Sequence, residues 1–432
     1  MLTPRNLATQ WAAFSKIQRP AIVVLLVDSS LRFLPPISGP CRFVLPESHR
    51  GLAVDERINQ VVDLEYPCGL TDVHRAMGLG QTKRLDSQQL HVVVRDPPEP
   101  ELAIRADGSA TPAWDAWRRD MAETVPRLAG QLNGTYPTLP DLAVQIPSDD
   151  PWAAEMLRRL QMMKLIKPRT STRDGDMQRG LRQPLTIAGT RAPRAASFLR
   201  TGFAANFAEA LLLAELVSAK SPAVKLTLAA VASALRVGIS NILGRGSNTP
   251  SPNLRGPGAQ LRHKGRLWTA LGVLAGAPAT PPGPNADLRT PFDEFQHRFA
   301  EITEAVDWKS LSPVLPERLS DEEVLAVEMA IVSAWLQNLA FISHPTGSIS
   351  YAVEAISGQQ FWYPEAQALE AHPDHRFAVR FGLCKNGANY ATDTLTLVSN
   401  DAVLDVLMGL FPAGPDGEMP DYMALLKNSH GE

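Results

Sequence analysis

The hydrophobic periodicity of the chain changes near Thr111, and this change constrains the fold more than any other feature. Before it, short apolar runs such as Ala21–Val27 (AIVVLLV) alternate with proline-rich connections, which is typical of short strands. After it, apolar residues recur every three or four positions behind Thr-Pro, Asp-Pro and Ser-Pro helix starts. The sequence therefore predicts an α+β protein that is predominantly α-helical, with a β-containing N-terminal region.

Linkers and composition divide the chain into four predicted regions. They are a β-containing N-terminal region (1–150), a basic helical middle region (151–276), a proline-rich linker (277–290) and a helical C-terminal lobe (291–432). Further short strands are expected at Cys41–Leu45, Leu90–Arg95 and Leu102–Arg105. The alternating runs Phe377–Leu383 and Leu395–Leu397 flank Asn386-Gly387 and add a small hairpin to the C-terminal lobe.

Several helix starts are specific enough to place individual helices. Ser221-Pro222 and Thr290-Pro291 each combine a capping side chain with a proline at the first helical position. Ser320 and Glu323 have the spacing of a capping box. The helix that begins after Ser221 has an apolar stripe, and Gly244 is expected to end it.

Charge is distributed very unevenly along the chain. Residues 157–266 hold 19 Lys and Arg against 4 Asp and Glu, while the whole chain has a formal charge of −3, so the flanks together carry about −18. A cationic middle between acidic ends points to a polyanionic partner. Loops within this middle, such as residues 167–200 and Gly244–Arg266, also contain the glycine and proline that let backbone N–H groups approach phosphates.

Two groups of cations form the predicted phosphate-binding surface. Arginine pairs with phosphate oxygens through two N–H groups, and such contacts make binding salt-sensitive and indifferent to sequence. Aromatic residues in this middle are few and follow an apolar pattern, which favours backbone contacts over base readout. The first group is Arg158, Arg159, Lys164, Lys167, Arg169, Arg173, Arg179, Arg182, Arg191 and Arg194, and the second is Arg245, Arg255, Arg262, Lys264 and Arg266.

Other interpretations of the basic middle remain open. Its cations could instead lie on solvated helix faces, paired with the acidic flanks or with a neighbouring subunit. A polyanion other than nucleic acid would satisfy the same charges.

Catalytic and metal-binding motifs are weak by comparison. Glu365–His375 (EAQALEAHPDH) contains imidazoles and carboxylates that suit a transition metal, but Pro373 interrupts any helix that would set their spacing. The chain has no GxSxG motif and no phosphate-binding loop with its lysine. Three separated cysteines give no disulfide framework, and the sequence predicts no catalytic residue, metal or cofactor.

In size and charge layout the chain resembles the nucleocapsid or capsid proteins of RNA viruses, although no diagnostic motif carries the resemblance. It implies a structural protein, not an enzyme, that assembles in many copies and encloses RNA or another nucleic acid. The expected location is the virion or host cytoplasm, without secretion or a membrane span. The alternatives are a metal-dependent enzyme of unknown class and a scaffold subunit that binds no nucleic acid.

Overall fold

The structure, a computed structural model, describes only part of the chain. The described residues are 42–45, 48–55, 60–67, 89–92, 151–168, 185–187, 191–243, 253–276, 290–306, 314–342, 350–363, 377–386, 389–392 and 394–412. The strands predicted at Ala21–Val27 and Leu102–Arg105, the helix predicted after Thr111, and residues 277–289 of the linker lie outside them.

Two compact units make up the chain. The first comprises residues 1–51 and 65–112, and the second comprises residues 52–64 and 113–432. Within the first, β1 (Arg42–Leu45) pairs in parallel with β4 (Gln89–Val92). These strands agree with two of the predicted strands, whereas the predicted region boundaries at 150, 276 and 290 remain predictions.

The second unit contains all of the described helices. They are α4 (Pro151–Met162), α6 (Arg191–Arg200), α7 (Phe207–Ser218), α8 (Pro222–Val237), α9 (Ile239–Leu243), α10 (Gly256–Gln260), the 3-10 turn η3 (Arg262–Lys264), α11 (Arg266–Gly276), α12 (Pro291–Ala305), α13 (Asp321–Ala334), the 3-10 turn η4 (Leu336–Asn338) and α14 (Asn400–Leu410). A short antiparallel pair, β5 (Ile166–Pro168) and β6 (Leu185–Ile187), lies between α4 and α6 in the sequence.

The predicted helix starts are confirmed at three places. The Ser221 hydroxyl accepts a hydrogen bond from the Val224 N–H at the start of α8. Thr290 begins α12 and Ser320 begins α13, each with a complete capping box. The predicted end of α8 is wrong, because Gly238 ends the helix at a φ of 94° and Gly244 does not.

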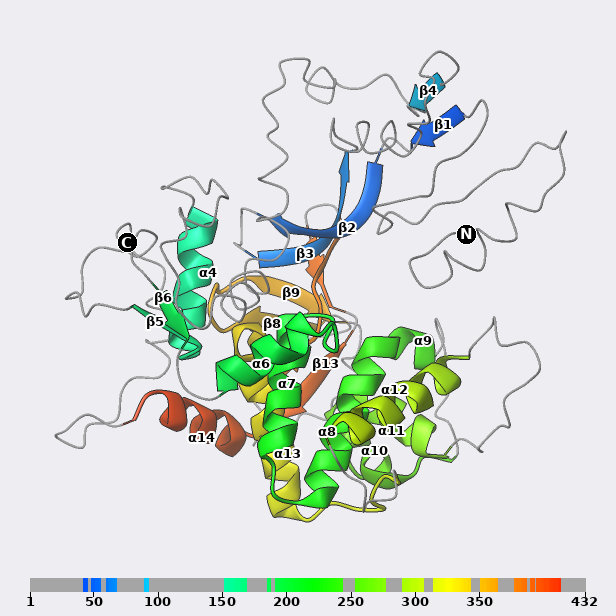
Figure 1. The fold of residues 1–432 in the computed structure, drawn as a ribbon, viewed down its shortest axis with the longest axis vertical. Helices are drawn as coiled ribbons and strands as arrows, with labels where there is room; N and C mark the ends of the chain where they lie inside the picture. Colours follow the sequence, from blue (N-terminus) through cyan, green and yellow to red (C-terminus); the bar gives the residue numbers. More distant parts are fainter. Residues whose placement is uncertain are drawn as a thin grey trace, which may run out of the picture. The chain divides into compact units, whose positions relative to one another are not determined.

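A helical bundle forms the larger hydrophobic core. Helices α7, α8, α12 and α13 pack together, with α8 in contact with the other three (Figure 1). Helix α8 is rich in small residues on its buried faces, among them Ala229, Ala230, Ala232 and Ala234. Small side chains at these positions let three neighbouring helices approach the same helix closely.

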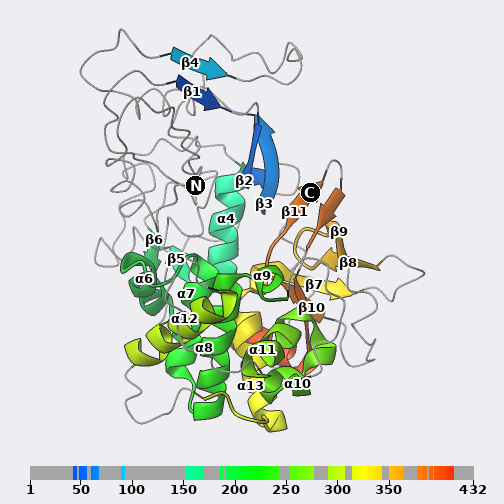
Figure 2. The same cartoon turned by 90° about the vertical axis from the view of Figure 1, so that its right-hand side faces the viewer.

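A nine-stranded mixed sheet forms the second layer. Its strand order is β13-β10-β7-β8-β9-β12-β11-β3-β2. The strands are β2 (Ser48–Asp55), β3 (Gln60–Pro67), β7 (Leu339–Ile342), β8 (Ser350–Glu354), β9 (Gln360–Tyr363), β10 (Phe377–Arg380), β11 (Cys384–Asn386), β12 (Asn389–Ala391) and β13 (Leu395–Val398). Figure 2 shows strands β7 to β11, in yellow and orange, beside the helices.

The prediction of a predominantly helical fold with only a small C-terminal hairpin is wrong. The predicted pairing is present, because β10 pairs antiparallel with β13, but both strands belong to the large sheet. The C-terminal strands are three to five residues long, and the missed strand β7 (LAFI) is apolar at every position. A short apolar run of this kind lacks the alternation that identifies a strand, so sequence periodicity could not separate it from a helical segment.

One junction joins the bundle to the sheet. The Lys264 ammonium in η3 forms a buried ion pair with Glu328 of α13, whose other carboxylate oxygen accepts the Ser399 N–H at 3.0 Å. The Lys264 carbonyl accepts a hydrogen bond from the Thr396 hydroxyl at 3.2 Å. Gly265 has a φ of 128°, and a Cβ there would lie 2.3 Å from the Leu395 carbonyl oxygen. The backbone of this turn therefore lies directly against strand β13.

Candidate nucleic-acid interface

The predicted cations of α4 are engaged within their own helix. Glu155 accepts two hydrogen bonds from Arg158, both at 2.8 Å, and one from the Arg159 Nε at 2.7 Å. The side chain of Arg159 is only 3% exposed. Burial alone would raise the pKa of Glu155, but its hydrogen bonds with the two arginines and their charges outweigh burial and hold the pKa below its ordinary value. One carboxylate thus binds two of the predicted phosphate ligands.

The other predicted residues near α4 are only partly described. Lys164 is exposed and lies over the Phe411 ring, with 5.8 Å between its Nζ and the ring centroid. Lys167 lies in β5. Five predicted residues lie outside the described part of the chain, namely Arg169, Arg173, Arg179, Arg182 and Arg245.

Helix α6 contributes two predicted cations with different surroundings. Arg191 forms an ion pair with Glu215 of α7 at 2.9 Å and donates a hydrogen bond to the Ser333 carbonyl oxygen. Burial lowers the pKa of Arg191 below its ordinary value, and the charge of Glu215 opposes this effect. Arg194 is exposed and donates to the Ser218 hydroxyl at 2.7 Å. Of the two, only Arg194 presents its charge mainly to solvent.

The remaining predicted residues lie on a hairpin formed by α10, η3 and α11, which we call the α10–α11 hairpin. Its two helices touch at Gly258 and Gly272, because a Cβ at Gly258 would lie 2.0 Å from the Gly272 backbone nitrogen. Arg255 and Arg262 are exposed, and Arg266 is half-buried. Lys264 points inward to Glu328 and is 6% exposed. The hairpin therefore turns one cation into the core and keeps the others at its surface.

The sequence around the hairpin contains no carboxylate. No Asp or Glu occurs between Leu216 and Gly276, so any acidic partner must come from another part of the chain. Such partners reach Lys264 and Arg236. Among the residues that the structure describes, no carboxylate pairs with the exposed Arg255, Arg262 or Lys220. This carboxylate-free stretch is a sequence signal that marks the hairpin more sharply than the overall charge count does.

A second cationic group was missed by the sequence prediction. We call it the Glu209 cluster, and it comprises Glu209 of α7, Arg236 of α8 and Arg298 of α12. Glu209 accepts the Arg236 guanidinium at 3.3 Å, the Arg298 guanidinium at 3.1 Å and the Ala205 N–H at 2.7 Å. Arg298 also lies over the Phe203 ring, 4.3 Å from its centroid, and donates to the Phe203 carbonyl oxygen. Arg298 lies outside the basic middle region, so a count of charges there could not include it.

The two predicted groups of cations lie on different elements. Helix α6 packs on α7, whereas α11 packs on α8, α9 and β13. The described part of the first group is partly engaged by Glu155 and Glu215. In the described part of the second group, Arg255 and Arg262 are exposed, Arg266 is half-buried and Lys264 is buried. Whether these residues bind nucleic acid remains a prediction, and the α10–α11 hairpin is the part that best meets the need for accessible charge.

The described residues hold no cluster of metal ligands and no membrane-spanning helix. The segment Glu365–His375, where the sequence offered possible metal ligands, lies outside the described residues. The described residues include no group of three or more His, Cys, Asp or Glu placed to hold a metal ion. Within that same part of the chain, no helix has the length and apolar character needed to span a membrane.

Comparisons with known proteins assign no family. No protein-family model matches the chain. No curated protein matches it either.

The solved structures that resemble the chain include two of HrpB from Escherichia coli. One is described as a DExH-box NTPase, with a TM-score of 0.47, 15% identity, and coverage of 85% of this chain and 35% of that chain. The other is described as a DEAH/RHA helicase, with a TM-score of 0.40, 13% identity, and coverage of 84% and 35%. The chain thus spans about a third of the length of the structures that it matches.

These comparisons contradict the predicted class of protein. The matched structures are those of an NTPase and helicase, not of a capsid or nucleocapsid protein, so the capsid and virion interpretation and the prediction of a non-enzyme are wrong. The predicted assembly of many copies rested on the same resemblance and has no other support. Because both TM-scores are below 0.5, no activity, substrate or site residue of HrpB is carried over to this chain.

Proposed function

We propose that this protein binds a nucleic acid through its phosphate groups, with the α10–α11 hairpin as the contact surface. One observation supports the proposal above all. Arg255 and Arg262 are exposed on elements that contain no carboxylate, and no carboxylate elsewhere in the described residues pairs with them. A cation without an acidic neighbour is available to a phosphate at little electrostatic cost.

The spacing of these arginines suits an extended anion. Arg262 and Arg266 are four residues apart around the start of α11. Arg255 lies near the other end of that helix, because its N–H donates to the Gly272 carbonyl oxygen at 3.1 Å. Gly272 follows Arg266 by six positions in α11, which corresponds to roughly 9 Å along the helix axis. Charges spread over this length favour a chain of phosphates over one small anion.

The hairpin has little means of reading bases. Its one tryptophan, Trp268, is 1% exposed and belongs to the hydrophobic core, and it has no phenylalanine or tyrosine. Contacts would therefore be made to the backbone, and binding would depend on salt far more than on sequence.

The salt dependence of binding tests this function. Fluorescence anisotropy with a labelled single-stranded polyuridine oligonucleotide, at increasing KCl, gives the slope of log K against log salt concentration. Each lost phosphate contact reduces the magnitude of that slope by about 0.7 for a single strand. The double variant Arg255→Gln/Arg262→Gln is therefore expected to reduce it by about 1.4.

A matched variant, Lys164→Gln/Arg194→Gln, removes the same charge from the turn after α4 and from α6. It is expected to leave the slope closer to that of the wild type. An equal reduction in both double variants would overturn the hairpin as the contact surface, as would an absence of oligonucleotide binding at low salt. Poly-glutamate that competes as well as the oligonucleotide at equal charge would indicate an acidic protein partner instead.

A further inference from the structure

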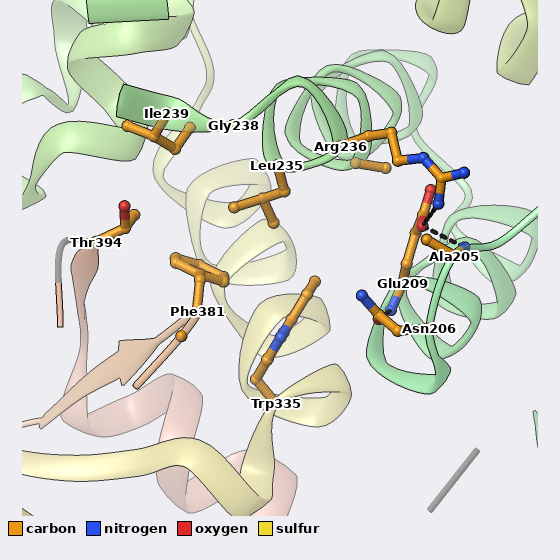
Figure 3. A pocket seen from close by; sticks show the side chains of 12 residues that line it. Ala205, Asn206, Glu209, Leu235, Arg236, Gly238, Ile239, Trp335, Phe381 and Thr394 are labelled. Carbon is orange, nitrogen blue, oxygen red and sulfur yellow. Dashed lines mark hydrogen bonds and ion pairs between the residues drawn. The ribbon is translucent and has the colours of Figure 1, made fainter. Parts of the chain in front are cut away.

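A cavity next to the Glu209 cluster has the chemistry of a ligand site. Its volume is about 310 Å³, and it lies where α7, α8 and the end of α13 meet the loops after β10 and before β13. Figure 3 shows the side chains of Leu235, Arg236, Trp335 and Phe381 around this space. Small-molecule pockets occupy about 300–1,000 Å³, so this cavity suits a ligand with one ring system and one polar group.

One side of the cavity is aromatic. Trp335 and Phe381 meet edge to face, with ring centroids 5.1 Å apart and an interplanar angle of 81°. Trp335 is 6% exposed and is fixed by its position at the end of α13, whereas Phe381 is half-buried. The Phe381 N–H donates to the Thr394 carbonyl oxygen at 3.2 Å, which holds the ring beside the cavity. A fixed, partly accessible ring is a stacking surface for a planar ligand.

The other side carries a guanidinium with unused hydrogen-bond donors. Arg236 is 31% exposed and makes one contact with Glu209, at 3.3 Å. A guanidinium has five N–H donors. Glu209 is only 7% exposed and also accepts hydrogen bonds from Arg298 and the Ala205 N–H. Glu209 also lines the cavity, but two arginines compensate its single negative charge, so the net charge on this side of the cavity is positive.

We infer that this cavity binds a single nucleotide, with the base against Phe381 and the phosphate at Arg236. An aromatic ring and a guanidinium at two sides of one small cavity match the two parts of a nucleotide, a planar base and a dianionic phosphate. The Thr394 side chain also lines the cavity, and its hydroxyl has no hydrogen-bond partner among the described residues. The edge of the base or a ribose hydroxyl can form a hydrogen bond with this threonine hydroxyl.

Three small-molecule probes test the aromatic side and the arginine side of this site separately. Isothermal titration calorimetry of the full chain with AMP, adenosine and ribose 5-phosphate compares the whole ligand, the base with its sugar, and the phosphate with its sugar. AMP is expected to bind at least tenfold more tightly than either of the others, because each fragment loses one of the two contacts.

Two substitutions are expected to affect different probes. Arg236→Gln should weaken AMP binding about tenfold and leave adenosine unchanged, since adenosine has no phosphate. Phe381→Leu should weaken AMP and adenosine to a similar degree and leave ribose 5-phosphate unchanged. Arg194→Gln is the control, because Arg194 is an exposed arginine of α6 that does not line the cavity. Arg236→Lys keeps the charge and should retain much of the AMP affinity if Arg236→Gln proves unstable.

Two results would overturn the inference. One is equal affinity for AMP and ribose 5-phosphate, which would describe an anion site without base recognition. The other is no binding of any probe at millimolar concentration by a folded protein. Neither result bears on the α10–α11 hairpin, whose test uses an oligonucleotide and different residues, so the two proposals can fail separately.

Discussion

The α10–α11 hairpin and the Glu209 cluster hold their arginines in opposite ways. In the hairpin, Arg255 and Arg262 are exposed, and no described carboxylate pairs with them. In the Glu209 cluster, Arg298 is 11% exposed and shares one carboxylate with Arg236. Each arrangement contains two arginines, but only those of the hairpin lack a carboxylate partner among the described residues. An excess of cations therefore becomes a binding surface only where the chain's own carboxylates are out of reach.

Lys264 is the exception within the hairpin, and its removal is expected to have the largest effect on stability. Lys264→Ala leaves Glu328 buried without its cation, which costs about 3–5 kcal/mol of unfolding free energy. Urea denaturation followed by circular dichroism measures this loss. The double variant Lys264→Met/Glu328→Gln removes both charges and keeps an acceptor for the Ser399 N–H, so it should recover most of the loss. A loss below 1 kcal/mol for Lys264→Ala would show that this cation is dispensable for folding.

The Glu209 cluster is expected to depend more on Arg298 than on Arg236. Arg298→Ala removes an ion pair, a hydrogen bond to the Phe203 carbonyl oxygen and a contact with the Phe203 ring, and should cost about 2–3 kcal/mol. Arg236→Ala removes a single ion pair, with Glu209, that is more exposed than the Arg298 pair, and should cost about 1 kcal/mol of unfolding free energy. The same denaturation experiment compares the two. Equal losses would contradict the distinction between a structural arginine and one that is available to a ligand.

Glu155 should make the folded state sensitive to acid. Its pKa is lower in the folded protein than in the unfolded chain, so its contribution to stability is present above the unfolded pKa and is lost as the pH falls through the folded pKa. Glu155→Gln should therefore destabilise the protein at neutral pH and weaken the dependence of its stability on pH in the acidic range. Thermal melting at a series of pH values from neutral to acidic measures both effects. A variant with an unchanged pH dependence would show that the arginine pairs of α4 contribute nothing in solution.

The smallest effect on stability is expected for the hairpin arginines. Arg255→Gln/Arg262→Gln removes two exposed side chains that no described carboxylate pairs with, and should change the unfolding free energy by less than about 0.5 kcal/mol. The same protein should nevertheless bind oligonucleotides less tightly. A large loss of stability here would place these arginines in the same structural role as Lys264 and remove the contrast with the Glu209 cluster.

Local helix signals could be predicted from sequence because their causes are local. The caps at Ser221, Thr290 and Ser320 each depend on residues within three positions, and all three are present in the structure. The sheet could not be predicted in the same way. The local pairing of β10 with β13 was predicted, but strand β11 pairs with β3 through Cys384↔Asp63, two residues far apart in the sequence, and no local pattern encodes that contact.

The candidate site was only partly predictable for the same reason. Arg255, Arg262 and Arg266 were included because they lie in a basic segment. Lys264 lies in the same segment, yet it is buried, because its partner Glu328 is supplied by a distant helix. The pairing of Arg298 with Glu209 likewise joins residues 89 positions apart. Composition measures how much charge a segment carries, but tertiary packing decides which charges remain accessible.

The junction at Glu328 has a consequence for the order in which the molecule folds. Its contacts join Lys264 to Glu328 over 64 residues, Glu328 to Ser399 over 71, and Lys264 to Thr396 over 132. Closing loops of this length has an entropic cost that grows with separation, whereas capped helices and neighbouring helix pairs form over short distances. Contacts within the bundle also span long separations, such as Ser221 to Glu323 over 102 residues and Ser333 to Glu215 over 118. The capped helices and neighbouring pairs such as α7 with α8 should therefore form first, and the bundle and the sheet should close later, together with this junction.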